Sequence, residues 1–160
     1  MISLLRSLSY LLICVLGLFV WFGMYRTWQL ERSPDQARFL AGTIPQAFPD
    51  GLYTGSVPGH KVSWLGKKFD AIHWSGINLF ENGSSTPSEK YPFVTSEERG
   101  LRDTYTNVIV IDYDIEENPF WLRPIRDEIV EIGPGHFLGK LQVRLIPWYP
   151  FTLAFFELKK

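Results

Sequence analysis

Hydrophobic residues are concentrated in one long run at the start of the chain and in shorter runs after it. Positions 8–24 contain neither a charge nor a proline, and Arg6 and Arg26 bound this run. About 17 apolar residues is the short end of what crosses a bilayer core as a helix. Aromatic residues lie towards both ends of the run, as they do at the two interfaces of a membrane. The pattern predicts one N-terminal transmembrane helix within residues 1–27.

A cleaved signal peptide is the alternative, and it needs small residues just after the apolar core. Here the core ends in Trp21, Phe22 and Met24, which are bulky. Ile13 precedes Cys14, where the processing of a lipoprotein needs a small residue. We therefore expect an uncleaved anchor. Because Cys14 is the only cysteine, the chain can form no internal disulfide.

The charged residues that flank the apolar run give two conflicting predictions for the side of the membrane on which the C-terminal part lies. Arg26, Arg32 and Arg38 follow it, and a count of cations alone would keep the C-terminal part in the cytoplasm. A very short N-terminus with a basic residue before the apolar run is instead similar to a signal-anchor, which exports the segment after it. We expect the C-terminal part on the extracytoplasmic side.

Residues 28–50 have the pattern of a juxtamembrane linker with one short helix. Ser33 and Pro34 are typical of a helix start, as N-cap and first-turn residue. Gly42 can take the left-handed conformation that ends a helix. Two further prolines predict an extended approach to the next segment.

Residues 51–160 have the hydrophobic pattern of strands. Short aromatic or β-branched runs lie between glycine, proline or charged residues, at 52–55, 62–65, 72–80, 104–113, 128–132, 136–145 and 151–158. The continuous run 108–111 predicts burial on both faces of one strand. Residues 81–96 are polar and predict a long loop, and a helix stays open near 119–126. The pattern predicts one all-β domain of seven or eight strands, an antiparallel barrel or sandwich.

The charge balance argues against one class of partner. Removing Arg6 from the 16 basic residues leaves 15 against 17 acidic ones. A nucleic-acid-binding protein needs a basic face. We therefore expect no nucleic acid as a partner.

Candidate catalytic and metal-binding residues are few. A zinc site needs three or four converging ligands, usually at short spacings, and the three histidines stand far apart. Asp112 and Asp114 share one face of a strand and could bind a hard cation. A solvated strand end, or ion pairs with Arg123 and Arg126, accounts for them better. With no nucleophile elbow and no phosphate-binding loop, we expect no metal and no cofactor, and no motif supports an enzyme.

One motif stands out early in the strand region. Trp64, Gly66, Lys67 and Phe69 follow the order Trp-x-Gly-Lys-x-Phe. A tryptophan ring can fill the taper of a small barrel while a nearby glycine lets its strand bend. Trp64 is then either core or part of a cavity wall. We expect Lys67 and Lys68 to be solvated.

This motif resembles the Gly-x-Trp-x-Gly-Lys-x-Phe motif of the lipocalin-like, calycin-type bacterial barrels, with Val62 where the leading glycine would stand. A second stretch of that family, Tyr-Asp…Pro…Arg…Asp, is similar to Tyr113, Asp114, Pro119, Arg126 and Asp127, with extra residues around Glu116 and Glu117. The resemblance spans roughly residues 51–140. It implies a lipocalin-like barrel with an apolar interior.

The last segment of the chain is apolar and aromatic. Trp148, Tyr149 and Phe151 stand at the start of a strand that could close the barrel. If these rings project outwards, they form an exposed patch that faces a membrane or a partner. We expect them to be buried.

These observations predict a membrane-anchored, lipocalin-like domain that binds a small apolar or lipid-like ligand. The expected ligand-binding residues are Trp64, Trp74, Phe80 and Tyr113 on the wall, with His73 or Arg126 orienting the ligand. The alternative is a non-catalytic accessory subunit of a membrane protein complex. A filled interior would favour the subunit, and an open cavity would favour the binding protein.

Overall fold

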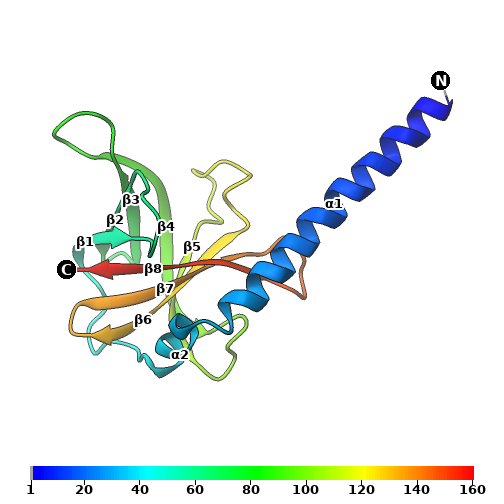
Figure 1. Ribbon diagram of the computed structural model, residues 1–160. Coiled ribbons are helices and arrows are strands. Elements are labelled where there is room, and N and C mark those ends of the chain that lie inside the picture. Colours follow the sequence, from blue (N-terminus) through cyan, green and yellow to red (C-terminus); the bar gives the residue numbers. More distant parts are fainter. Residues whose placement is uncertain (1) are drawn as a thin grey trace.

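The computed structural model describes residues 2–160, with side chains from Arg6 onwards. Two helices come first, α1 (Ile2–Leu30) and α2 (Pro34–Ala41). The strands are β1 (Gly51–Ser56), β2 (Trp64–Asp70), β3 (Ser75–Phe80), β4 (Ser88–Arg99), β5 (Asn107–Asp112), β6 (Ile125–Gly133), β7 (His136–Val143) and β8 (Phe151–Lys159). Each strand pairs antiparallel with the next, and β8 pairs with β1, so the sheet closes (Figure 1). The predicted antiparallel barrel of seven or eight strands behind an N-terminal helix is confirmed, and it has eight strands.

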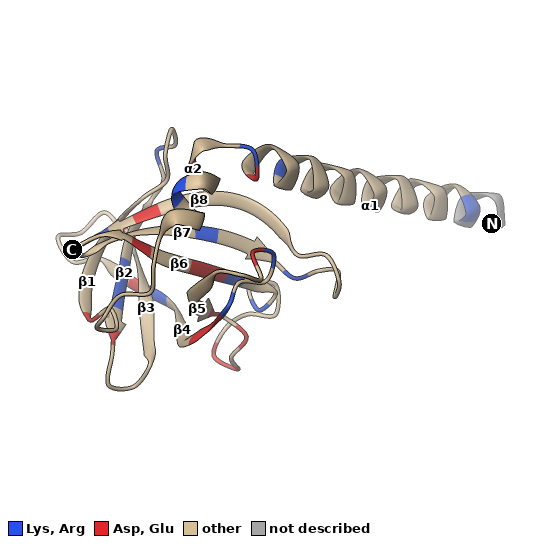
Figure 2. Cartoon of the chain, turned by 90° about the horizontal axis from the view of Figure 1, so that it is seen from below, with Lys and Arg blue, Asp and Glu red and all other residues tan. Residues whose placement is uncertain are grey.

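The first helix projects away from the barrel for most of its length (Figure 1). Its segment Arg6–Leu30 is long and apolar enough to cross a membrane, judged by length and composition. Figure 2 shows a long stretch of this helix without a charged residue, with charges near its start and again beside the barrel. The side chains of this stretch are almost all exposed.

The run 108–111 lies in β5 and is buried on both faces, as the sequence predicts. Ile109 and Ile111 point into the barrel interior, among its core aromatic side chains. Val108 and Val110 point outwards and pack beneath Phe39 of α2. The barrel therefore has two apolar clusters, one inside and one between its outer face and the helices.

The polar segment 81–96 is shorter as a loop than predicted. Its second half belongs to β4, which pairs with β3 and with β5. Tyr91 has φ 59° where the β3–β4 register shifts, so a bulge accommodates this residue in the strand. Pairing on both sides outweighs the weak strand propensity of a Ser-, Pro- and Glu-rich sequence. Residues 119–124 form turns rather than the helix that the sequence left open.

The linker packs against the barrel. Phe39 of α2 is fully buried, and Thr43 pairs with Glu131 of β6 through two backbone hydrogen bonds. Two details of the helix ends differ from expectation. Gly42 has φ −72° instead of a left-handed conformation, and the Ser33 hydroxyl donates to the carbonyl of Leu30 instead of capping α2.

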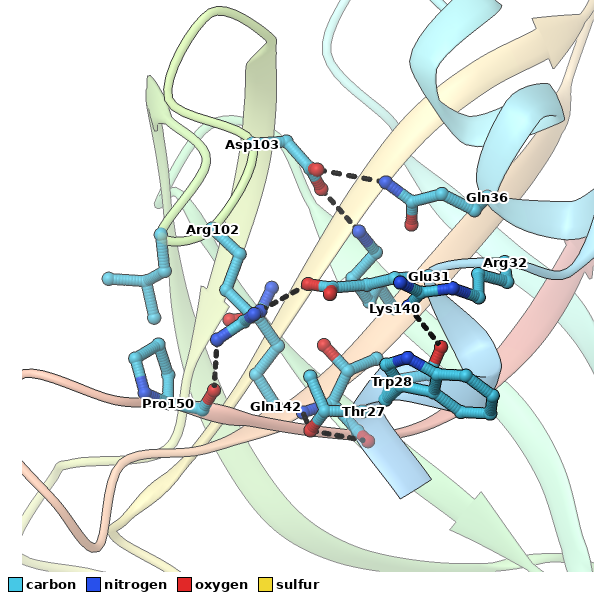
Figure 3. Close-up of polar contacts among 12 residues, drawn as sticks. Thr27, Trp28, Glu31, Arg32, Gln36, Arg102, Asp103, Lys140, Gln142 and Pro150 are labelled. Atoms are coloured by element: carbon cyan, nitrogen blue, oxygen red, sulfur yellow. Dashed lines mark hydrogen bonds and ion pairs between the residues drawn. The ribbon is translucent and has the colours of Figure 1, made fainter. Parts of the chain in front are cut away.

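Polar side chains join the end of α1 and the start of α2 to the barrel (Figure 3). Arg102 Nε donates to Glu31 at 2.5 Å, and Gln36 Nε2 donates to Asp103 at 2.8 Å. Lys140, fully buried on the outer face of β7, also donates to Asp103. Buried charged groups need such partners because solvation is lost. The network therefore fixes both helices on the barrel surface.

Candidate ligand-binding cavity

The two ends of the barrel differ. At one end, which we call the mouth, residues 57–63, 81–87, 113–124 and 144–150 connect the strands. At the other, the closed end, the connections are 71–74, 100–106 and the β6–β7 turn. Buried aromatic side chains fill the interior towards the closed end, where Tyr53, Phe69 and Phe93 pack edge to face.

A cavity of about 270 Å³ occupies the mouth half of the barrel. Ten of its lining residues are apolar or aromatic: Val57, Val62, Trp64, Phe80, Tyr91, Leu122, Ile125, Leu141, Ala154 and Phe156. Four are polar, and they gather at its inner end: Lys67, Asn78, Tyr113 and Asp127. We call these four residues the Lys67 cluster. An apolar wall with a few convergent polar groups is the common form of a small-molecule site.

Lys67 is the centre of its cluster, and its side chain is 2% exposed. Its ammonium group donates to Asn78 Oδ1 at 2.8 Å, to the Tyr113 hydroxyl at 2.5 Å and to Asp127 Oδ2 at 3.0 Å. Four aromatic ring centroids lie 5.2–5.5 Å from Nζ. All three N–H donors are therefore used, and the surrounding ring faces add cation–π attraction.

Burial changes the protonation behaviour of two members of the cluster. Burial lowers the pKa of Lys67, against the opposing effect of the Asp127 carboxylate. Burial, together with the charge of Asp127, raises the pKa of Tyr113 well above its usual value of 10.0. Tyr113 is thus a neutral phenol that donates to Asp127 Oδ2 at 3.0 Å.

One acceptor of the cluster is unused. Asp127 Oδ1 is buried and has no hydrogen-bond partner among residues 2–160. Its other oxygen receives Lys67 and Tyr113. A buried carboxylate oxygen without a donor is costly. The residue Asp127 lines the cavity, while this particular oxygen is enclosed by protein atoms.

A bulge in β2 places the motif residues inside the barrel. The β2–β3 register shifts between Trp64 and Gly66, so Trp64 and Lys67 both line the cavity although they are three positions apart. Gly66 has φ 134°, and a Cβ atom there would overlap the carbonyl oxygen of Tyr53. Only glycine fits this position.

Three of the six predicted ligand-binding residues line the cavity, and three do not. Trp64, Phe80 and Tyr113 are on its wall, and their role in binding stays a prediction. His73 and Trp74 instead lie in the turn between β2 and β3 at the closed end. The His73 ring contacts Asp70 at 2.7 Å with its side chain 73% exposed. The Trp74 ring packs on Phe48 at 4.6 Å and is half-exposed.

Arg126 faces the outside of the barrel instead of the cavity. Its guanidinium contacts Glu98 at 3.0 Å on β4, across the intervening strand β5, and Glu128 at 3.4 Å on its own strand β6. Successive side chains of a strand point to opposite faces, so Asp127, the next residue, points inwards. The sequence analysis thus predicted Arg126, whereas the residue that lines the cavity is its neighbour Asp127.

Sequence reasoning missed Lys67, Asn78 and Asp127 as cavity residues. Lys67 was expected in solvent with Lys68, because β-strand alternation from Trp64 does not foresee the bulge. A signal was present, since Lys67 and Asp127 both belong to the two stretches that carry the family resemblance. A charged residue in each stretch is what a buried ion pair requires.

The acidic segment after β5 does not form a metal site. Of the two explanations offered by the sequence, a solvated strand end or ion pairs with Arg123 and Arg126, the structure gives Asp112 a different ion pair, with Arg144 at 2.8 Å. Within the described part of the chain, no group of three or more His, Cys, Asp or Glu side chains is placed to hold a metal ion.

No family model, no curated protein and no solved structure matches this chain. The chemistry of the cavity itself therefore carries the functional argument.

Proposed function

We propose that this protein is a membrane-anchored barrel that binds a small, apolar, lipid-like molecule in the mouth cavity. The observation that carries the proposal is a cavity of about 270 Å³ with apolar walls and one group of polar lining residues, the Lys67 cluster. An interior filled to both ends would have favoured the accessory-subunit alternative. The open mouth half supports the binding protein instead.

The size and lining of the cavity define the class of ligand. At ~30 Å³ for each molecule of liquid water, the cavity holds the volume of about nine waters. That is room for one hydrocarbon chain of moderate length. The apolar walls favour such a chain through burial from water. The Lys67 cluster favours a ligand with a neutral polar end, such as a hydroxyl group, because the buried charges of Lys67 and Asp127 already pair with each other.

The packing of α1 supports its role as a retained anchor. The side chains of the apolar stretch are almost all exposed. Contact with water is unfavourable for these side chains, whereas contact with the hydrocarbon core of a bilayer is not. The following turns belong to the barrel domain: Arg26 Nε donates to the carbonyl of Leu153 at 3.1 Å, and the backbone N–H of Thr152 donates to Thr27 Oγ1 at 2.9 Å. Cleavage after the apolar stretch would sever this helix from the part that packs on β8.

Binding is tested on the full chain purified in a mild detergent. We would add 1-dodecanol and its methyl ether separately and measure occupancy by native mass spectrometry. The alcohol is expected to bind several-fold more tightly, because its hydroxyl can donate a hydrogen bond to the Lys67 cluster, whereas the ether has no donor, and one such bond contributes ~0.5–1.5 kcal/mol. Equal occupancy by the two probes would show that the Lys67 cluster accepts no hydrogen bond from the ligand.

A matched pair of variants locates the binding. Ala154→Phe places a ring inside the cavity and is expected to abolish occupancy. Ala47→Phe makes the same change at an exposed position of the linker and should leave occupancy unchanged. The proposal fails if the wild type takes up neither probe, or if Ala154→Phe binds 1-dodecanol as well as Ala47→Phe does.

A further inference from the structure

We infer that the mouth of the barrel is held against the bilayer surface and that the cavity takes a single-chain amphiphile directly from the membrane, polar end first. This inference rests on the proposed function, since it names the source and the orientation of the ligand in the same cavity. Four features of the structure carry it.

The first feature is the position of the cavity opening. The lining residues lie where strands end or begin at the mouth, for example Trp64 at the start of β2, Phe80 at the end of β3 and Ala154 near the start of β8. The closed half is filled by aromatic side chains. A ligand therefore enters through the mouth.

The second feature is the direction of α1. Gly23 lies against the ring of Phe151, and Arg26 and Thr27 bond to residues 153 and 152. The helix thus leaves the barrel beside the start of β8, which is at the mouth. Its apolar stretch, which precedes Gly23, continues outwards beyond this end (Figure 1). A bilayer that contains this stretch lies on the mouth side of the barrel.

The third feature is the brace between α1 and the mouth. Arg102 bonds to Glu31 at the end of α1, and its guanidinium lies 4.6 Å from the ring centroid of Tyr149. The same residue donates to the carbonyl of Pro150 at 3.1 Å (Figure 3). One arginine thereby ties the helix to the loop 144–150 at the mouth. The brace fixes the direction of the barrel relative to the membrane.

The fourth feature is a set of exposed apolar side chains on two mouth loops. Phe120 and Trp121 of the loop 113–124 are 83% and 54% exposed. Leu145 and Trp148 of the loop 144–150 are 68% and 84% exposed. The burial expected for Trp148 is therefore wrong. Exposed apolar residues gathered beside a membrane helix fit the interface of a bilayer, where tryptophan rings are favoured.

The arrangement also orients the ligand. A molecule that leaves the bilayer through the mouth brings its polar end into the barrel ahead of its chain. That end meets the Lys67 cluster at the inner end of the cavity. The chain stays among the aromatic side chains nearer the membrane. A long-chain alcohol satisfies both requirements without turning around.

The seating of the barrel is tested with nitroxide spin labels on the full chain in phosphatidylcholine vesicles. In a Cys14→Ser background, a label is attached after Trp148→Cys or after Trp121→Cys. A matched control carries the label at Ile72, which is 85% exposed in the β2–β3 turn at the closed end. We expect labels at the mouth to be relaxed by oxygen more than by an aqueous nickel chelate, and the control label to show the reverse. Identical behaviour at both ends would overturn the inference.

Uptake from the membrane is tested with 1-dodecanol as the probe. Trp148→Glu and the control Ile72→Glu are loaded either in detergent or from vesicles that contain the alcohol. In detergent, both variants should reach the occupancy of the wild type. From vesicles, Trp148→Glu should load roughly ten-fold more slowly, because a charge is disfavoured in the membrane, while Ile72→Glu loads normally.

The outcomes separate this inference from the proposed function. If Trp148→Glu loads from vesicles as fast as the wild type, uptake through the mouth at the membrane is wrong and the binding function stands. If the wild type takes up no alcohol even in detergent, the proposed binding function is wrong. The inference that the ligand is taken directly from the membrane is then wrong as well. The spin labels still decide in that case whether the mouth faces the bilayer.

Discussion

At the residue scale, two neighbouring lysines have opposite environments. Lys67 is enclosed by the barrel and pairs with Asp127, whereas the Lys68 side chain is 55% exposed and contacts Glu89 at 3.4 Å. An ion pair in water contributes little, because solvent screens it. A buried pair is different, since removing one partner leaves the other charge without solvation or a counter-charge. The same residue type therefore has a different energetic role at adjacent positions.

Lys67→Met is expected to lower the free energy of unfolding by about 3–5 kcal/mol, because it leaves Asp127 as a buried, uncompensated carboxylate. Lys68→Met, the matched control, should change it by no more than about 0.5 kcal/mol. Denaturant unfolding of the full chain in detergent measures both. The double variant Lys67→Met, Asp127→Leu should be more stable than Lys67→Met alone. If it is less stable, the buried pair is not the source of the loss.

The raised pKa of Tyr113 has a spectroscopic consequence. We expect the folded wild type and the folded Tyr113→Phe variant to develop equal phenolate absorbance up to about pH 11, because burial and Asp127 keep this phenol protonated. Once both are unfolded in denaturant, the wild type should exceed the variant by the absorbance of one tyrosine out of seven. A difference already present in the folded proteins near pH 10 would contradict the burial of Tyr113.

The sign of the corresponding stability change is set by linkage. The folded state keeps the Tyr113 proton that the unfolded chain releases near pH 10. Its contribution to stability is therefore complete below that pH and is lost as the pH rises towards the folded pKa. Burial lowers the pKa of Lys67, so the folded state releases this proton at a lower pH than the unfolded chain does. In the alkaline range below the pKa of the unfolded chain, the effect of Lys67 therefore makes stability rise with pH. Phenolate absorbance reports Tyr113 alone and separates the two effects.

At the scale of the element, the bulge in β2 positions the cavity wall. Without it, Trp64 and Lys67 would point to opposite faces of the sheet. Gly66 allows the bulge because its φ is positive and because the backbone of β1 passes close to it. The Trp-x-Gly-Lys-x-Phe motif is thus the sequence of a bulged strand, and the bulge directs the Lys67 side chain into the barrel interior.

Gly66→Ala is expected to destabilise the barrel by about 4 kcal/mol or more, since the added methyl group would overlap the Tyr53 carbonyl in a strained backbone conformation. Gly133→Ala is the matched control, because a Cβ atom at Gly133 meets nothing within 4 Å. Thermal unfolding monitored by circular dichroism compares them. Equal melting temperatures for the two variants would show that β2 does not need this glycine.

At the scale of the whole molecule, the barrel is incomplete without the segment that precedes it. Its outer face carries an apolar cluster that includes Val110, Val130, Leu138 and Phe155, and Phe39 of α2 is buried on it. The sequence suggested a spacer for residues 28–50. In the structure this segment is part of the packing, and together with α1 it orients the mouth.

A chain that begins at Asp50 should be less stable than one that begins at Ser33 and keeps α2. Loss of the Phe39 side chain from a buried site alone costs about 3–5 kcal/mol, and the uncovered cluster becomes apolar surface. We expect a lower unfolding midpoint and stronger binding of a hydrophobic dye for the shorter chain. Equal stability of the two chains would mean that the packing of α2 does not stabilise the barrel.

The fold was largely predictable because it depends on local patterns. Short apolar runs separated by glycine and proline identified most strands, and the double-sided burial of 108–111 was expected from its composition. The strand β4 was missed in part, since a sequence with Pro92 and Tyr91 forms a strand only when neighbours on both sides pair with it. Aromatic residues of the cavity wall, Trp64 among them, were found because large apolar side chains go inside.

The sequence by itself determined an apolar N-terminal helix and an antiparallel barrel, because hydrophobic periodicity reports directly which faces avoid water. Only the tertiary structure decided which charges are inside. Asp127 and Arg126 are adjacent in sequence, yet one ends in the cavity and the other on the outer face, as the strand register dictates. The direction of the mouth relative to α1 was likewise beyond the sequence. It depends on contacts between Arg102 and Glu31, 71 positions apart.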